Sequence, residues 1–135
     1  MQSNRFALPV LALAAVLGSS ACSSEAKPVK IGVQPAPGDS IAISEAKTRW
    51  RTLCSTCHGM EGKGDGQAGL ALNPRPRTFT DTAWQKSVDD AHIRKIVLEG
   101  GAAVGKSPLM PANPDLADKP ETVDYLVKIV RSLGS

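Results

Sequence analysis

The feature that most constrains this chain is a run of five residues, Cys54-Ser55-Thr56-Cys57-His58. Cysteines at positions i and i+3 lie on one face of a helix, so both sulfurs can bond two carbons at one edge of the same flat ring. The histidine that follows is carried beneath that ring, where its imidazole can bind a central metal. The chain has 135 residues, enough for one domain, and its third cysteine, Cys22, is left over from this pair.

Other uses of the same five residues fit less well. A structural zinc site needs four ligands, usually from two such pairs, and outside the run the only further histidine is His92. A thioredoxin-type pair sits in a strand-helix unit, which this sequence lacks, and a simple disulfide would leave His58 without a role. C-x-x-C-H is the attachment pattern of a c-type haem. We therefore expect Cys54 and Cys57 to hold one covalent haem c as thioethers and His58 to bind its iron.

Residues 1–21 have the order of an export signal: Arg5, a 12-residue apolar run, then small residues. The run is too short to span a bilayer, which needs about 20 apolar residues. Cys22 comes next, as in the cleavage box of bacterial lipoproteins, although Ser19 stands where that family usually has Leu. The box favours a lipid anchor on Cys22, while ordinary cleavage after Ala21 would leave a free thiol.

We expect three segments in the chain. Residues 1–21 form a signal peptide that is removed, 22–42 an anchor cysteine with a flexible linker, and 43–135 the folded domain. The linker contains three prolines between Ser23 and Ser40 and little helical periodicity. Once Arg5 leaves with the signal, 15 basic side chains face 13 acidic ones with no run of like charges, so we expect no nucleic-acid binding.

The folded part is expected to be all-α. Apolar spacing predicts helices from about Ser44 to Gly59, from Val88 to Glu99 with Ser87 as its cap, and from Pro120 to Leu133 with Asp118 as its cap. Their apolar stripes are Ile43, Ala46, Trp50, Leu53, Cys54 and Cys57 in the first, Ile93, Ile96 and Val97 in the second, and Val123, Leu126, Val127, Val130 and Leu133 in the third. Long Gly- and Pro-rich stretches connect them, and such loops are uncommon unless they bind or wrap something.

The order of these landmarks resembles the class I c-type cytochromes, specifically small bacterial monohaem ones, over about residues 43–134. The resemblance rests on CSTCHG at 54–59, GMEGKGDG at 59–66, LNPRPRTFTD at 72–81, SPLMP at 107–111 and the last amphipathic helix. It implies a cytochrome c-like fold of three main helices and long loops wrapped around one covalently attached haem.

The resemblance also implies several contacts of that fold. The first and last helices would cross near one haem edge, with Trp50 or Leu53 against Tyr125 or Leu126. His58 would donate its other ring proton to a carbonyl of the proline segment, that of Pro74 or Pro76. Arg75, Arg77 and Trp84 are candidate donors to the haem propionates.

Met110 is the expected sixth ligand of the iron. Met60 lies two residues beyond His58 and cannot reach round to the opposite face of a ring. His92 lies beside two aspartates on a helix and is expected to face solvent. Met110 lies between Pro108 and Pro111, which fix the backbone dihedrals on either side, and it matches the family's methionine position.

A second motif is a false match. Gly100 to Ser107 satisfies the P-loop pattern G-x-x-x-x-G-K-[ST] of nucleotide-binding proteins. A P-loop follows a strand and opens a helix, whereas this segment follows a predicted helix and leads into Pro108. We therefore expect its glycines to let the backbone lie close to the haem instead.

An iron bound by His58 and Met110 has no open position, so we expect electron transfer and no enzymatic activity. The chain would be a monomeric carrier between redox protein partners in the periplasm, attached to the membrane if Cys22 is acylated. Two alternatives stay open. The chain could be the subunit through which electrons enter a larger respiratory oxidoreductase, or, if Met110 dissociates readily, a haem that binds gases or peroxide.

Overall fold

The computed structural model describes residues 34–134; the expected signal peptide and Cys22 lie outside this part of the chain. Its α-helices are α1 (Ile41–Arg49), α2 (Ser55–His58), α3 (Thr82–Ser87), α4 (Asp90–Glu99) and α5 (Pro120–Ser132). Shorter turns are the π-helix η1 (Trp50–Cys54) and the 3-10 helices η2 (Gln67–Gly69), η3 (Ala102–Val104) and η4 (Pro114–Leu116). Residues 34–134 contain no strand, in agreement with the all-α prediction, and none of their helices is long and apolar enough to cross a membrane.

The first helical segment runs without a break through α1, η1 and α2 and ends at Gly59, as expected. It begins earlier than Ser44, because the hydroxyl of Ser40 accepts a hydrogen bond from the amide of Ile43 at 3.3 Å and caps α1. In η1 the amide of Ser55 donates to the carbonyl of Trp50, five residues back. This wider turn rotates Leu53 off the face that carries Trp50. Leu53, expected in the buried stripe, is therefore 54% exposed.

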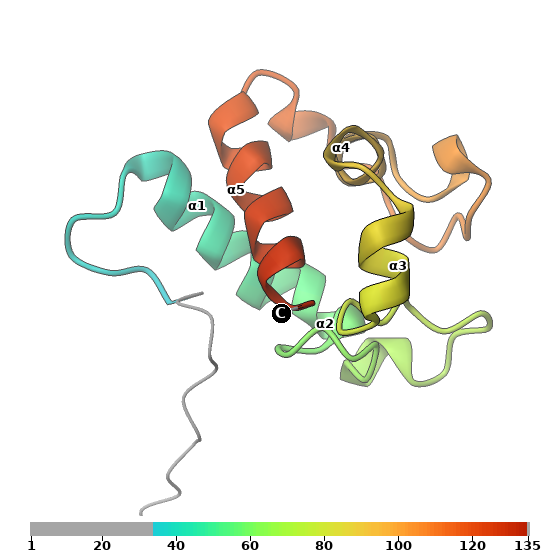
Figure 1. Ribbon diagram of the computed structural model, residues 1–135. Helices are drawn as coiled ribbons and strands as arrows, with labels where there is room; N and C mark the ends of the chain where they lie inside the picture. Colours follow the sequence, from blue (N-terminus) through green and yellow to red (C-terminus); the bar gives the residue numbers. More distant parts are fainter. Residues whose placement is uncertain (1–33, 135) are drawn as a thin grey trace, which may run out of the picture.

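Helix α5 packs against α1 (Figure 1), and with its C-cap residue Leu133 it supplies six of the eleven buried apolar residues of the core. Its five predicted core residues are all buried, which confirms that stripe. Trp50 is 1% exposed and Leu126 2%, so these two, among the four residues expected at the crossing, are the ones buried in the common cluster. Burial of each such side chain contributes about 1.5–3 kcal/mol to stability.

Helix α3 was not visible in the apolar pattern, because it is short and none of its residues is buried. Asp81 caps it, accepting hydrogen bonds from the amides of Ala83 at 3.0 Å and Trp84 at 3.1 Å. The next helix, α4, begins two residues later than predicted, and its cap is Asp89, not Ser87. The hydroxyl of Ser87 instead donates to the carbonyl of Trp84 at 2.8 Å and helps to end α3.

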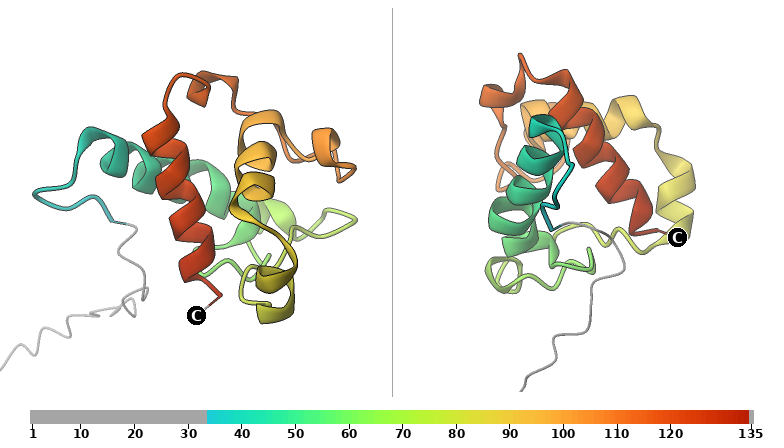
Figure 2. Two further views of the ribbon diagram at one scale, coloured as in Figure 1. Left: turned by 45° about the horizontal axis from the view of Figure 1, so that its top comes forward. Right: turned by 90° about the vertical axis from the view of Figure 1, so that its left-hand side faces the viewer.

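Two polar side chains fix α3 and the α3–α4 junction against α5. The side-chain Nε2 of Gln85 donates to the backbone carbonyls of Phe79 at 2.8 Å and Val130 at 2.9 Å. The guanidinium of Arg131 donates to the carbonyls of Gln85 at 2.6 Å and Val88 at 2.8 Å. Backbone carbonyls that the short helix leaves unpaired therefore find partners on α5. Figure 2 shows the resulting arrangement, with α3 and α4 along one side of α5 and α1 on the other.

The end of the expected linker belongs to the fold. Lys47 is only 6% exposed, and its ammonium pairs with Asp39 at 2.8 Å and lies 5.8 Å from the centre of the Tyr125 ring. Asp39 also accepts the amide of Ala36 at 2.8 Å. These bonds hold residues 36–40 to α1, which begins at Ile41.

Glu45 joins α1 to the start of α5 and should make stability depend on pH. It accepts hydrogen bonds from Lys119 at 2.6 Å and Thr122 at 3.2 Å, and the bond from Lys119 lowers the pKa of Glu45. A lowered folded-state pKa adds stability above the unfolded pKa, about 4.3, which is lost as pH falls through the folded value. We expect Glu45→Gln to reduce the free energy of unfolding at pH 7 by up to about 1 kcal/mol, and the difference to disappear in guanidinium denaturation as pH falls through the folded-state pKa of Glu45.

Asp118→Ala is the control, since it also removes a carboxylate close to the start of α5, which begins at Pro120. Lys119, not Asp118, is the N-cap residue of α5, and no side chain caps that helix. We expect a change within about 0.5 kcal/mol at any pH. A loss of about 1 kcal/mol would restore Asp118 as the cap, and an equal pH dependence in the two variants would contradict the role given to Glu45.

Candidate functional site

His58 ends α2 and is held at one of its two ring nitrogens. Its Nδ1 lies 3.1 Å from the carbonyl oxygen of Arg77, so Nδ1 carries the proton and donates it, and Nε2 keeps its lone pair. The ring is buried, and this burial lowers the pKa of His58. At neutral pH the imidazole is therefore uncharged, which is the form that binds a metal.

The carbonyl that holds His58 is not the one expected. The resemblance to class I c-type cytochromes implied the carbonyl of Pro74 or Pro76 as the acceptor. The acceptor is the carbonyl of Arg77, the residue after Pro76. The carbonyl of Pro76 faces Gly64 instead, and a Cβ added to Gly64 would lie 2.5 Å from the carbonyl oxygen. Successive carbonyls of an extended segment point in different directions, so only one of them can meet the ring.

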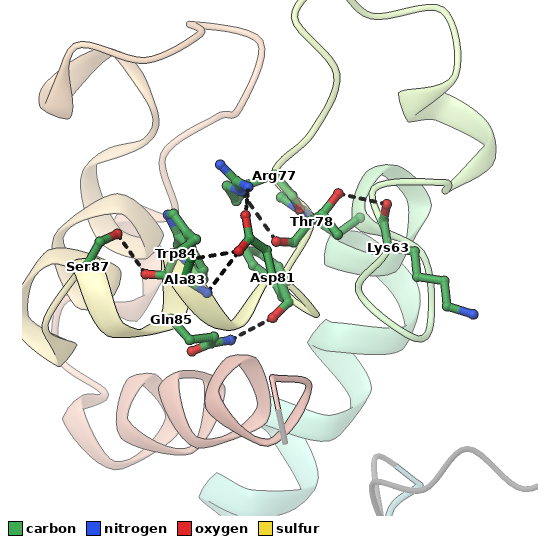
Figure 3. A network of polar contacts seen from close by, with 10 residues as sticks. Lys63, Arg77, Thr78, Asp81, Ala83, Trp84, Gln85 and Ser87 are labelled. Atoms are coloured by element: carbon green, nitrogen blue, oxygen red, sulfur yellow. Dashed lines mark hydrogen bonds and ion pairs between the residues drawn. The ribbon is translucent and has the colours of Figure 1, made fainter.

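The side chain of Arg77 ties this segment to α3 (Figure 3). Its guanidinium donates to one carboxylate oxygen of Asp81 at 2.6 Å and lies 5.6 Å from the centre of the Trp84 ring. The other oxygen of Asp81 caps α3. Arg77 and Trp84, two of the candidate propionate donors, therefore interact with each other, while Arg75 is exposed and makes no hydrogen bond or ion pair to the described residues.

Cys54 and Cys57 lie half-buried on either side of the α2 start, and they form no disulfide with each other. Burial raises the pKa of the Cys54 thiol to about 11. That sulfur lies among apolar neighbours, next to the core cluster. The pair has the spacing expected and is joined to His58 by the last turn of one helix.

A glycine-rich loop lies directly against the backbone of this turn. A Cβ added to Gly66 would lie 2.4 Å from the carbonyl oxygen of Thr56, and one added to Gly69 would lie 2.4 Å from that of Cys57. The amide of Gly66 donates to the carbonyl of Cys57 at 3.1 Å. Only residues without a side chain allow this approach, so the glycines fix the position of the cysteine-histidine run.

Met110 is half-buried in a loop that is held at the end of α4. Its carbonyl accepts the amide of Gly101 at 3.0 Å, and its amide donates to the carbonyl of Ser107 at 3.2 Å. Asn113 holds the far end of the loop, donating to the carbonyl of Val97 at 2.7 Å and accepting from Arg49 at 3.0 Å. The loop therefore presents Met110 from a position fixed by both α4 and α1.

The two other candidate ligands occupy different surroundings. Met60 follows Gly59 and packs, half-buried, against the core cluster. His92, expected to face solvent, is half-buried in the first turn of α4, where its backbone amide donates to Asp89. Among residues 34–134 no group of three or more His, Cys, Asp or Glu side chains could hold a metal ion.

The segment with the P-loop pattern uses its own amides internally. The amides of Val104 and Lys106 donate to the carbonyl of Gly101, and that of Gly105 donates to the carbonyl of Ala102. A phosphate would need such amides to point outward. With a helix before the segment and no strand, the nucleotide interpretation finds no support.

Phe79 lies at the centre of the site, and the sequence analysis missed it. Its ring stacks on that of His58 with centres 4.5 Å apart, and it contacts Trp84 at 5.3 Å and Trp50 at 6.1 Å. The indole N–H of Trp50 is buried and has no hydrogen-bond partner among the described residues. The available signal was a lone large apolar residue in a proline-rich stretch, which is too common to single out.

Comparison with known proteins agrees with this geometry. Residues 43–133 match the family model for cytochrome c. The chain belongs to the cytochrome c family. It is also similar to the cbb3-type cytochrome c oxidase subunit FixP of Azorhizobium caulinodans, at 31% identity over 126 residues, which are 93% of this chain and 39% of that protein. The chain thus spans about two-fifths of the length of this curated relative.

As a cytochrome c, the protein binds haem c covalently and serves in haem-based electron transfer. Its residues fit that group. Two unpaired thiols at the required spacing precede an imidazole whose Nε2 has a free lone pair. The buried N–H of Trp50, which would otherwise cost about 1–3 kcal/mol, is a donor that the described residues leave unused.

Gly69→Ala should reduce haem attachment. The added Cβ would meet the carbonyl of Cys57 at 2.4 Å and Cγ of Pro76 at 2.8 Å, so the turn with the cysteines must shift. We expect a clear fall in the ratio of haem absorbance to protein in purified material. Gly105→Ala is the control: its Cβ meets nothing within 4 Å, although φ is +70°, so it should lose about 1 kcal/mol of stability and keep its haem. Equal haem loss in both variants would contradict the role of the loop.

Proposed function

We propose that this cytochrome c carries one haem c, bound through thioethers to Cys54 and Cys57, with His58 and Met110 as axial ligands, and that it is a single-electron carrier and not an enzyme. The observation that supports this most strongly is the state of His58. Its Nδ1 is committed to the Arg77 carbonyl, which leaves Nε2 as a ligand atom directly after the two cysteines. When bound, the haem supplies an iron that alternates between two valence states.

The protein's own residues would set the properties of that iron. The Arg77 carbonyl, by accepting a hydrogen bond from Nδ1–H of His58, fixes the ring orientation and makes the imidazole a better donor to metal. The thioether of Met110 is soft and uncharged and favours the ferrous state, which raises the potential relative to two histidines. With ligands on both sides, the iron would have no position for a substrate.

Support for Met110 comes from its loop. The bonds of Gly101 and Asn113 tie the loop to two helices, so its position does not depend on Met110 itself. Pro108 and Pro111 restrict the backbone on both sides. Met60, by contrast, follows the helix that ends with His58 and belongs to the same side of the site.

Met110→Ala should leave the haem attached, lower its reduction potential and open the iron to carbon monoxide. Reduced spectra with and without carbon monoxide and a redox titration measure both effects. Met60→Ala and His92→Ala are matched controls that remove the competing candidate ligands, and neither should bind carbon monoxide. An unchanged potential in Met110→Ala, or an open iron in either control, would assign the ligand elsewhere. Rapid, complete binding in the unmodified protein would favour a gas-binding haem.

We also propose that the protein works in the periplasm, attached to the membrane through an acylated Cys22. The order of residues 1–21 and the small residues before Cys22 support this. Because Asp39 and Ala36 are bonded within the fold, the tether would be the 13 residues 23–35, a reach of at most about 45 Å. That distance would let the domain meet partners near the same membrane.

A second candidate is the subunit through which electrons enter a larger respiratory oxidoreductase. The similarity to an oxidase subunit favours it, although this chain spans only 39% of that protein. Both candidates use the same haem and the same ligands, so they differ only in whether a catalytic partner stays bound.

Native mass spectrometry of the protein purified in mild detergent tests these proposals together. We expect a monomer with the mass of one haem and of the acyl chains on Cys22. Cys22→Ser should remove only the acyl mass and move the protein to the soluble fraction, with its haem spectrum unchanged. A mature chain that starts at another residue would contradict the anchor. A stable complex with a catalytic partner would favour the subunit.

A further inference from the structure

Asn113 joins the loop that carries Met110, residues 107–113, to the rest of the domain. Its backbone amide donates to the carbonyl of Leu98 at 3.0 Å, and its side-chain nitrogen donates to the carbonyl of Val97 at 2.7 Å. Both carbonyls belong to the last turn of α4, so this end of the loop follows α4. The side-chain oxygen of Asn113 is left as the acceptor of a third bond.

Arg49 supplies this third bond from α1. Its Nη1 donates to the side-chain oxygen of Asn113 at 3.0 Å, and its guanidinium also pairs with the carboxylate of Asp115. The Arg49 side chain is only 15% exposed, whereas that of Asp115 is 55% exposed, so the contact with half-buried Asn113 is the better shielded from water. A charged donor in such a place makes a stronger hydrogen bond than a neutral donor does.

The place of Arg49 in the chain gives this bond its consequence. Arg49 is the last residue of α1, and the helical segment continues from it through η1 and α2 to His58. Cys54 and Cys57 lie on the same segment. The bond from Arg49 to Asn113 therefore joins the segment that carries one proposed ligand of the iron to the loop that carries the other.

Bonds inside the loop do not fix its place relative to α1. Pro108 and Pro111 have no amide to donate. The amide of Leu109 donates to the hydroxyl of Ser107 at 3.2 Å, and the amide of Met110 donates to the carbonyl of Ser107 at 3.2 Å. Both of these bonds move with the loop, so the position of Met110 depends on the bonds at the two ends of the loop.

We propose that Arg49 is a positioning residue for Met110, and that its bond to Asn113 controls how readily Met110 leaves the iron. This inference rests on the proposed function. Two ligands on opposite faces of one ring need a fixed spacing, and the contacts that join their two segments set that spacing. Without Arg49 the loop keeps its bonds to α4 and the bond from the Gly101 amide to the Met110 carbonyl, but neither contacts the segment that ends at His58.

Displacement of the sixth ligand by imidazole tests the proposal in the ferric haem protein. At saturating imidazole the binding rate equals the rate at which Met110 leaves. We expect Arg49→Ala to raise this rate at least about tenfold, since a hydrogen bond from a charged donor contributes that factor or more. Arg94→Ala is the matched control: it removes another arginine ion pair between helices, with Asp124, and should change the rate less than about twofold. Equal acceleration in the two variants would reflect general loss of stability and would overturn the proposal.

Two further variants separate the contacts of Arg49. Asp115→Ala removes the exposed ion pair and leaves the bond to Asn113, so the imidazole rate should stay within about threefold of that of the unmodified protein. Asn113→Ala should be at least as fast as Arg49→Ala, and adding Arg49→Ala to it should change its rate less than about twofold, because both changes remove the same bond. An Asp115→Ala protein as fast as Arg49→Ala, or fully additive effects in the double variant, would overturn the proposal.

Hydrogen exchange separates the failure of this proposal from that of the proposed function. The amide of Gly101 is bonded to the carbonyl of Met110, and it should exchange at least about tenfold faster in Arg49→Ala and less than about twofold faster in Arg94→Ala. Faster exchange with an unchanged imidazole rate would overturn Met110 as the ligand, and this proposal with it. An unchanged exchange rate together with an unchanged imidazole rate would overturn only the role of Arg49.

Arg49→Lys tests the proposal where Arg49→Ala fails to fold. Lysine keeps the positive charge and one donor but not the planar fork of the guanidinium. Both the imidazole rate and the exchange of the Gly101 amide should therefore rise at least about twofold and stay below the rates of Asn113→Ala. Rates equal to those of the unmodified protein would overturn the proposal.

Discussion

The site depends on one hydrogen bond between segments that are far apart in sequence, from Nδ1 of His58 to the carbonyl of Arg77. The bond is useful only if the carbonyl is fixed, and Arg77 is fixed through Asp81, which is at once its ion-pair partner and the cap of α3. Helix α3 is in turn held to α5 by Gln85 and Arg131. The orientation of one imidazole is therefore set by the packing of the main core helix, and a change on α5 can reach the histidine without touching it.

The first helical segment must satisfy two demands that an ordinary α-helix would combine poorly. Trp50 has to enter the core with α5, and in the proposed function Cys54 and Cys57 have to face the haem. The π-turn of η1 separates these demands by rotating the chain after Trp50, and Leu53 is released to the surface as a result. A pattern of period 3.6 assumes one helix type throughout, so it correctly predicted Trp50 in the core and wrongly buried Leu53.

How far the sequence could predict the rest depended on how many residues competed for each role. The stripe of α5 repeats over 13 residues and had no rival. The cap of α4 was predicted to be Ser87 and is Asp89, because only the folded backbone decides which residue is extended at the helix start. Met110 could be named from its prolines, but the bonds of Asn113 that place its loop join residues distant in sequence. Such pairings follow from the packing of helices and leave no local pattern.

Many of the charged side chains pair with one another between helices. Ion pairs such as Lys119 with Glu45 and Arg131 with Asp90 connect α1, α4 and α5 around the outside of the core. Each of these surface ion pairs adds little to stability, about 0–1 kcal/mol. Gly66 and Gly69, which pack on the turn with the cysteines, permit the close approach of the backbone there.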